Sequence, residues 1–326
     1  MTPVVSMVEL TKSYGRVRGI ESVDLQLNPG EVFGFIGPNG AGKTTTIRLL
    51  MDFIRPTSGS ASIFGLDVHR SAVEIHARVG YLPADIALFD RMTASDLFRW
   101  LGRLRGNFDP AYVNELVERL DLDPSRSIEE LSTGNRQKVG VIQAFMHRPE
   151  LLMLDEPTSG LDPFVRRQFR ELVKEAKRSG STVFLSSHEL TEVEDICDRV
   201  GIIVGGRMRS VETMAVLRES VRRHVHVLLA PGVDFNETKP ISGVSNLAVL
   251  TSNNGRGIVL EMDVAGPLDH LIKTLANYRV VDLVSEPLSL EDYFLEAYDN
   301  GHPGSSSRED AQRNSKPAAP EVSHVG

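Results

Sequence analysis

The stretch with the clearest chemistry is a glycine-rich loop, "GPNGAGKT", over Gly37–Thr44. It follows an apolar run, Glu31–Gly37, and precedes a segment with helical character, which is the context of a phosphate-binding loop. The glycines permit a tight backbone whose N–H groups surround a phosphate, and the helix N-terminus adds partial positive charge. Lys43 would supply a charge to the β- and γ-phosphates, and the Thr44 hydroxyl could bind Mg²⁺. We therefore expect a nucleotide site instead of a flexible turn with an exposed lysine.

Two adjacent acids end a second apolar run, "LLMLDEP", over Leu151–Pro157. At the end of a strand, Asp155 can hold the water shell of Mg²⁺. Glu156, one step further, can polarise an attacking water as a general base. The plain alternative is a strand that ends in solvated acids. The phosphate loop elsewhere in the chain favours the catalytic interpretation.

A second helix start suited to an anion occurs in "LSTGNRQKVG", Leu131–Gly140. The Ser132 hydroxyl, the Gly134 N–H and a helix N-terminus could all point at one anion. The alternative is a serine-capped helix that binds no ligand. If both starts bind phosphate, one chain carries two separate phosphate-binding elements.

Composition limits the classes of protein to which the chain can belong. Its 326 residues are enough for two domains, and 41% apolar with 25% charged residues is typical of a globular protein. A net charge of −8 gives no basic excess for binding nucleic acid. Cys197, the single cysteine, excludes a disulfide framework and is predicted to be a small buried residue. No apolar run reaches the ~18 residues that cross a bilayer, and the start does not resemble a signal peptide, so contact with a membrane is expected only through a partner.

Strands and helices alternate over residues 1–215, which predicts a largely parallel sheet. The runs "LLML" and "TVFL" are wholly apolar, as expected for central strands covered on both faces. Leucine- and arginine-rich helical pieces over Thr93–Leu122 predict a helical insertion. The stretch "GIIVGGRMRS" predicts a hairpin over Gly205–Gly206.

A small α+β unit is predicted over residues 216–299. It begins with the alternating stretch "HVHVLLA" and continues with a hairpin around "SNNGRG", a helix "PLDHLIKTLANY" and a strand "RVVDLV". Ser289 and Asp292 form a predicted capping box before a final helix. Residues 300–326 are rich in Gly, Ser and Pro and are predicted to be disordered.

With "SSHELTEVE" as a fourth motif, the chain resembles the ATP-binding subunit of an ABC transporter over Val4–Ser210. The resemblance implies a P-loop NTPase fold of the α/β class in residues 1–215: a mainly parallel sheet, an antiparallel β subdomain and a helical subdomain at about 90–148. It also implies a head-to-tail homodimer. In this dimer the family's signature motif, here Leu131–Asn135, would cover in one copy the γ-phosphate held by the other. That arrangement would explain two phosphate-binding elements in one chain.

The resemblance assigns roles to individual residues. Lys43, Glu156 and His188 are the implied catalytic residues, and Asp162 is the implied dimer-loop residue. Mg²⁺ is implied at Thr44 and Asp155. The implied ATP-binding residues are Tyr14, Gly37, Pro38, Asn39, Gly40, Ala41, Gly42, Lys43, Thr44 and Thr45, with Tyr14 stacking on adenine. The implied signature residues, which act in trans, are Leu131, Ser132, Thr133, Gly134 and Asn135. The eight other histidines show no ligand spacing and are expected to be surface or hydrogen-bonded groups.

The sequence departs from the family pattern in two places. Thr133 and Asn135 replace a glycine and a glutamine of the signature. Because both are small and polar, we expect the function of the signature to be adjusted and not lost. Ala84, followed by Asp85, stands where the family places a glutamine that reaches Mg²⁺ and water. The resemblance implies that the loop Gly80–Phe89 senses the transmembrane partner. Either this loop works through backbone contacts, or hydrolysis is weaker than usual.

The function expected is Mg²⁺-dependent ATP hydrolysis that powers transport through a separate integral membrane permease. Motion would pass through the Gly80–Phe89 loop and the helices of 93–122, and the subunit would lie at the inner, cytoplasmic face of the membrane. The C-terminal unit resembles that of subunits serving exporters of drugs, antibiotics or lipids. The alternatives are a soluble ABC-type ATPase of DNA repair or translation, and a regulatory module that binds nucleotide without turnover.

Overall fold

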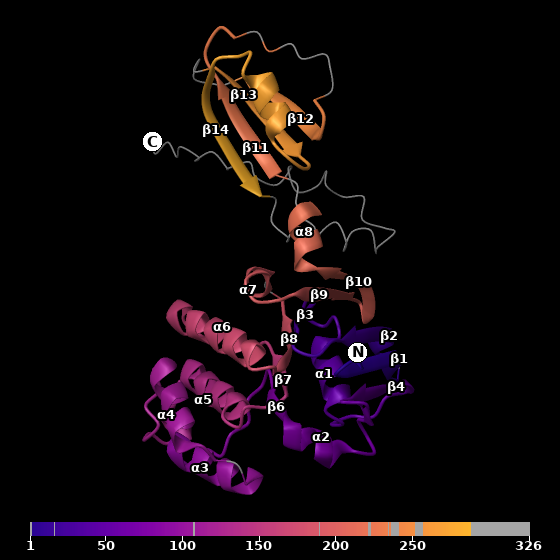
Figure 1. The fold of residues 1–326 in the computed structure, drawn as a ribbon, viewed down its shortest axis with the longest axis vertical. Coiled ribbons are helices and arrows are strands. Elements are labelled where there is room, and N and C mark those ends of the chain that lie inside the picture. Colours follow the sequence, from indigo (N-terminus) through magenta and orange to yellow (C-terminus); the bar gives the residue numbers. More distant parts are fainter. Residues whose placement is uncertain are drawn as a thin grey trace, which may run out of the picture.

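The structure is a computed structural model, shown in Figure 1. It describes residues 2–15, 17–106, 108–188, 190–220, 223–233, 235, 241–251 and 257–287. Three sheets make up the framework of this part of the chain. Within these ranges, no helix combines the length and the apolar character needed to cross a bilayer.

A six-stranded sheet in the order β10-β9-β3-β8-β7-β6 carries the site. Its strands are β3 (Val32–Ile36), β6 (Val79–Leu82), β7 (Leu151–Asp155), β8 (Thr182–Ser187), β9 (Arg199–Val204) and β10 (Arg207–Thr213). All neighbours pair in parallel except β9 and β10, which form the predicted hairpin over Gly205–Gly206. Every residue of β3, β7 and β8 is buried. This confirms the interpretation of the two apolar runs in β7 and β8 as central strands.

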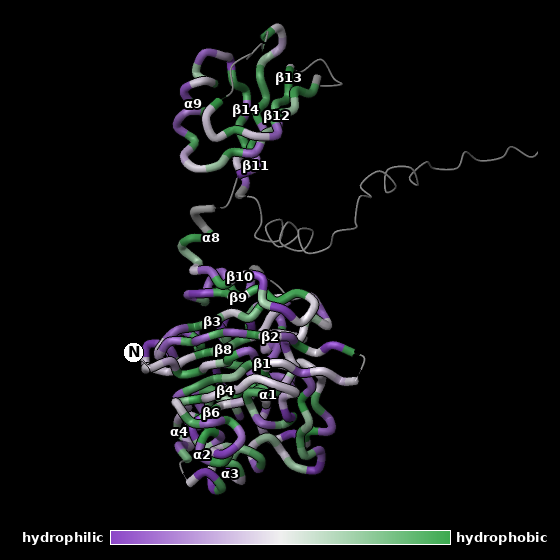
Figure 2. Tube along the Cα trace, turned by 90° about the vertical axis from the view of Figure 1, so that its right-hand side faces the viewer, coloured by the Kyte–Doolittle hydropathy of each residue, from purple (hydrophilic) through white to green (hydrophobic). Residues whose placement is uncertain are grey.

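Two hydrophobic cores lie on opposite faces of this sheet because successive side chains of a strand point to opposite faces. In β3, Val32 belongs to one core and Phe33 to the other. The first core contains α5 (Thr133–Phe145) and α6 (Pro163–Arg178), and the second contains α1 (Lys43–Leu50). The shorter helices are α2 (Ala72–Arg78) and α7 (Leu190–Glu194). The tube in Figure 2 places hydrophobic stretches along the strands of this part of the molecule.

A four-stranded sheet in the order β2-β1-β4-β5 forms the predicted antiparallel subdomain. Its strands are β1 (Val5–Tyr14), β2 (Val17–Leu27), β4 (Ser58–Ile63) and β5 (Leu66–Asp67). It shares the second core with α1, so the end of β1 lies on the same unit as the phosphate loop.

The predicted helical insertion contains α3 (Ala94–Arg105) and α4 (Pro110–Arg119), followed by a 3₁₀ turn at Ile128–Glu130. Thr93 begins α3 by accepting a hydrogen bond from the Asp96 N–H at 3.1 Å. Asp109 caps α4 in the same way, with proline at the first helical position. The P-loop NTPase fold with its antiparallel and helical subdomains is therefore confirmed.

The third sheet, β12-β13-β11-β14, stands apart from the others and has its own core (Figures 1 and 2). Its elements are β11 (Arg223–Leu229), β12 (Val244–Thr251), β13 (Ile258–Val264), α9 (Asp269–Leu275) and β14 (Val280–Pro287). The helix α8 (Met214–Ser220) precedes it, and Met214 and Leu217 are buried in the first core. The predicted α9 helix and β14 strand are present. The turn at 252–256, the capping box at Ser289 and residues 300–326 lie outside the described residues, and the domain limits stay a prediction.

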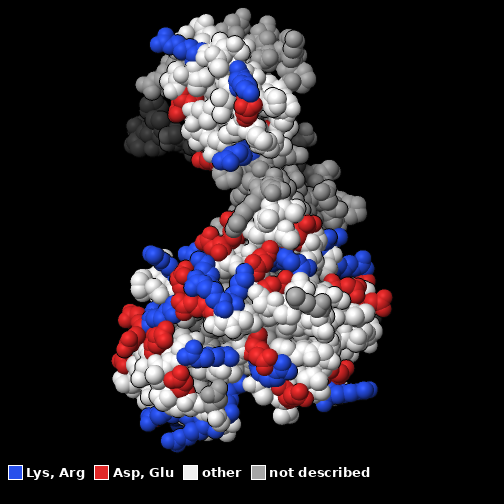
Figure 3. Space-filling view, viewed as in Figure 1, with Lys and Arg blue, Asp and Glu red and all other residues white. Residues whose placement is uncertain are grey.

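Charge is mixed on the face of the molecule drawn in Figure 3, where basic and acidic side chains alternate over both units. Cys197 is buried, as predicted, and burial raises the pKa of its thiol well above the usual value. A thiol in that state is a hydrophobic residue and not a nucleophile.

Candidate nucleotide-binding site

The phosphate loop connects β3 to α1, and its glycines are required by its geometry. A Cβ at Gly37 would lie 2.2 Å from the Ile203 carbonyl oxygen. Gly42 has a φ of 111°, and a Cβ there would lie 2.6 Å from the side chain of Ile20. Side chains are therefore excluded at both ends of the loop, and its backbone can approach a phosphate closely.

Lys43 is the first residue of α1 and is almost fully buried. Its Nζ donates to the carbonyl oxygens of Gly37 at 2.6 Å and Pro38 at 3.3 Å. These bonds hold the ammonium over the loop. The carbonyl groups of Gly37 and Pro38 therefore contact Lys43. Asn39 and the residues after it line an open cleft.

This cleft has a volume of 410 Å³ and joins residues that are far apart in the sequence. Its described lining is Tyr14, Val17, Arg18, Gly19, Asn39, Gly40, Ala41, Gly42, Lys43, Thr44, Thr45, Ala84 and Glu156. Phosphate-loop residues predicted to bind ATP therefore share one space with the predicted general base and the predicted adenine contact.

Tyr14 lies at the end of β1 and is 47% exposed. The Lys12 ammonium lies 5.2 Å from the ring centroid, within the range of a cation–π contact. A ring presented to a cleft in this way suits stacking on a planar base. Its contact with adenine stays a prediction.

The three predicted catalytic side chains meet at Glu156. Its Oε1 lies 3.1 Å from Lys43 Nζ, and its Oε2 lies 2.7 Å from His188 Nδ1. Glu156 has a φ of 49°, and its N–H donates to the Ser186 carbonyl oxygen and hydroxyl at 3.2 and 3.1 Å. The end of β8 therefore fixes a left-handed turn that aims the carboxylate back at the phosphate loop.

Asp155, the last residue of β7, is completely buried beside the cleft. Its Oδ1 accepts a hydrogen bond from the Ser186 hydroxyl at 2.5 Å. Its Oδ2 has no hydrogen-bond partner among the described residues. Burial raises the pKa of this carboxyl, and the hydrogen bond from the Ser186 hydroxyl opposes that rise.

A buried carboxylate oxygen that accepts no hydrogen bond fits a divalent cation. The positive ion would stabilise its charge, which otherwise requires protonation. Thr44 and Asp155 are therefore the residues that would hold Mg²⁺. The ion would supply positive charge to the β- and γ-phosphate oxygens.

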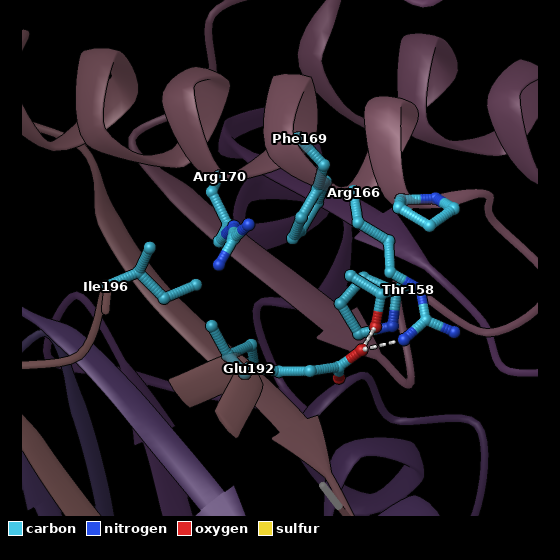
Figure 4. Close-up of a pocket in the computed structure, with 9 residues that line it drawn as sticks. Thr158, Arg166, Phe169, Arg170, Glu192 and Ile196 are labelled. Atoms are coloured by element: carbon cyan, nitrogen blue, oxygen red, sulfur yellow. Dashed lines mark hydrogen bonds and ion pairs between the residues drawn. The ribbon is translucent and has the colours of Figure 1, made fainter. Parts of the chain in front are cut away.

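Glu192, on α7, was not predicted, and it links the segments that carry Glu156 and His188. Its Oε2 accepts a hydrogen bond from the Ser187 hydroxyl at 2.9 Å. Its Oε1 accepts one from the Thr158 hydroxyl and lies 3.6 Å from the Arg166 guanidinium. Figure 4 shows Glu192 reaching toward Thr158 and Arg166 across a pocket of 230 Å³. The only signal in the sequence was its place four residues after His188.

Replacing Glu192 by glutamine is expected to lower the ATPase kcat roughly tenfold, because a bond between neutral groups is weaker than one to a carboxylate. The KM for ATP should change little, since Glu192 does not line the cleft. Steady-state kinetics check this, with Glu171→Gln as the matched change of an exposed acid. An unchanged kcat would show that Glu192 has no positioning role.

The five signature residues lie at the start of α5 and outside the cleft that the described phosphate-loop residues line. Ser132 and Thr133 are exposed, and the Ser132 hydroxyl accepts from the Asn135 N–H at 3.3 Å. Asp162 is also exposed and caps α6 by accepting from the Val165 N–H at 3.0 Å. Within its own chain each motif is a helix cap, so their roles in trans stay predictions.

Ala84 does line the cleft, at the place where the family's glutamine was expected. A methyl group can neither coordinate Mg²⁺ nor orient water. Asp85 is exposed and is not among the described residues that line the cleft.

Comparisons with known proteins identify the family of the chain. Residues 20–159 match the family model described as "ABC transporter". The bacitracin transport ATP-binding protein BcrA of Bacillus licheniformis is 34% identical over 71% of this chain and 76% of its own length.

Two solved structures have the same fold. An ATP-binding subunit of an ABC transporter aligns with a TM-score of 0.61 and 28% identity, over 66% of this chain and 92% of that one. A dimeric ATP-binding cassette in a post-hydrolysis state, bound to ADP and Pi, aligns with a TM-score of 0.59 and 22% identity, over 64% of this chain and 98% of that one. On this evidence, the chain belongs to the ATP-binding subunits of ABC transporters and is an ATPase of that family.

Proposed function

We propose that the chain hydrolyses Mg²⁺-ATP as a head-to-tail homodimer whose closing and opening drive export through a separate membrane permease. The observation that carries the dimer is the position of the signature. Ser132 and Gly134 form a helix start suited to an anion, yet they lie outside the cleft that contains Lys43. A second copy would bring its own Ser132 over the phosphates held by the first.

The chemistry proposed for each site follows from the groups around Glu156. Its carboxylate acts as the general base that polarises water, and His188, 2.7 Å away, orients it. Lys43 and the loop N–H groups bind the charge of the transferred phosphoryl group. Loss of that group removes the anion that joins the two copies, so the dimer would then open.

Coupling to a permease is proposed through the loop after β6 together with α3. Phe89 and Trp100 are 57% and 43% exposed, and their rings meet edge to face with centroids 5.3 Å apart. Exposed aromatic pairs are typical of protein contacts. The subunit would then lie at the inner face of the membrane, held there by the permease.

The proposed cargo class is an antibiotic or another amphipathic molecule, which rests on the bacitracin transport role in the name of a relative. A second candidate, a nucleotide-binding regulatory module, is favoured by one observation. Ala84 leaves the cleft without the glutamine side chain expected there.

Transport in inverted membrane vesicles tests this function. The chain would be produced with a candidate permease, and uptake of labelled bacitracin and of a lipid analogue would be measured. We expect uptake that needs ATP and both proteins. Purification of the chain with ribosomes or DNA, and not with membranes, would contradict the proposal. A complex that binds ATP without turnover would support the regulatory module.

A further inference from the structure

Two histidines share one face of the C-terminal sheet. Along β11 the side chains alternate, so Val225 and Val227 are buried in the third core while His224 and His226 lie on the opposite face. Their rings pack edge to face with centroids 4.6 Å apart. The spacing His-x-His on a strand therefore brings two imidazoles together.

A carboxylate from the neighbouring strand completes a cluster. Glu261 on β13 lies directly opposite His226, and its Oε1 is 3.5 Å from His226 Nδ1. One donor atom from each of His224, His226 and Glu261 can be chosen so that all three lie within 4.8 Å of one another. Four-coordinate Zn²⁺ holds its ligand atoms at about 2.0–2.2 Å, so these three donor atoms would move closer together on binding one ion.

A second carboxylate, that of Asp263, orients the ring of His224. Asp263 lies opposite His224, with Oδ1 2.6 Å from His224 Nδ1, and its Oδ2 accepts from the Asn246 side-chain amide at 2.7 Å. A carboxylate on one ring nitrogen fixes the tautomer and leaves the other nitrogen to bind a metal, as in carboxylate–histidine–zinc triads. Asp263 thus holds Nδ1 of His224, and Nε2 is the nitrogen that an ion would bind.

We propose that His224, His226 and Glu261 bind a divalent transition-metal ion of the Zn²⁺ type. Two imidazoles and one carboxylate are borderline ligands that suit Zn²⁺ better than Mg²⁺ or Ca²⁺, which prefer oxygen alone. All three side chains are partly exposed, so the ion has access and keeps a position for water or another ligand. The site lies on a different sheet from the ATP cleft and is independent of the function proposed above.

His224 and His226 are among the histidines expected to be surface or hydrogen-bonded groups. Because they are two residues apart on strand β11, their side chains face the same way. The third ligand could not be read from the sequence, since it depends on the register between β11 and β13.

Isothermal titration of the full chain with Zn²⁺ tests the site, after any affinity tag has been removed. We expect one Zn²⁺ per chain, with affinity reduced at least tenfold in His226→Gln and in Glu261→Gln. Asp263→Asn should weaken binding by roughly 10–100-fold as a loss of orientation. His270→Gln, a change of an exposed histidine on α9, is the matched control and should bind as the original does.

Circular dichroism and the ATPase rate of each variant verify folding. If Zn²⁺ does not bind, or if folded His226→Gln and Glu261→Gln both bind as tightly as the original chain, the proposal is wrong. If one variant fails to fold, the other decides.

Discussion

Glu156→Gln is expected to lower the ATPase kcat by about 10²–10⁴-fold, the range of a general base. The amide keeps the size of the side chain but cannot take a proton from water. It also lacks the charge that pairs with Lys43 at 3.1 Å and with His188 at 2.7 Å. Lys43 then loses a competing anion, so ATP should bind at least as tightly as before. Single-turnover hydrolysis and fluorescent-nucleotide binding measure the two effects separately.

The matched control for this change is Glu171→Gln on α6, an exposed acid paired with Lys174. Its kcat should stay within a factor of two of the original value, since surface pairs contribute about 0–1 kcal/mol. A Glu156→Gln chain that turns over ATP at the original rate would remove Glu156 from the chemistry.

Ser132→Asp is expected to lower ATP turnover about 100-fold, because a carboxylate would face the γ-phosphate held by the other copy. Aspartate is as good an N-cap as serine, so α5 should still begin at Thr133. ATP should still bind each separate chain, because the described lining of the cleft includes no signature residue. Turnover of the original chain should rise more steeply than its concentration, and light scattering should detect an ATP-dependent dimer.

Ser132→Thr keeps the hydroxyl and the cap and is the control for this experiment. Mixing Ser132→Asp with Lys43→Ala should restore turnover, since one intact phosphate loop then meets one intact signature. A Ser132→Asp chain with full turnover, unaffected by dilution, would show that each copy works alone.

Most of the ATP-binding part could be predicted because its signals are local. The apolar run that ends at Gly37 identified β3 as a strand, and the glycines of 37–42 identified the loop before α1. The hairpin was predicted from two adjacent glycines, Gly205 and Gly206, and in the structure both have positive φ, 57° and 80°. In each case neighbours in the sequence are also neighbours in the structure.

The parts that were missed depend on contacts between distant segments. Glu192 acquires its role from Thr158, Arg166 and Ser187, which come from three separate segments. Glu261 joins His226 only through strand register. The sequence supplied the residue types in both cases, but the partners are set by tertiary packing.

The ion pair between Lys43 and Glu156 has a consequence for the binding of ATP. The ammonium already has an anionic partner, so arrival of the terminal phosphate exchanges one counter-anion for another. The Glu156 carboxylate displaced in that exchange is the proposed general base, which must then contact water. We therefore expect nucleotide binding and release of Glu156 to occur together, so that the carboxylate becomes available to water only after a terminal phosphate has paired with Lys43.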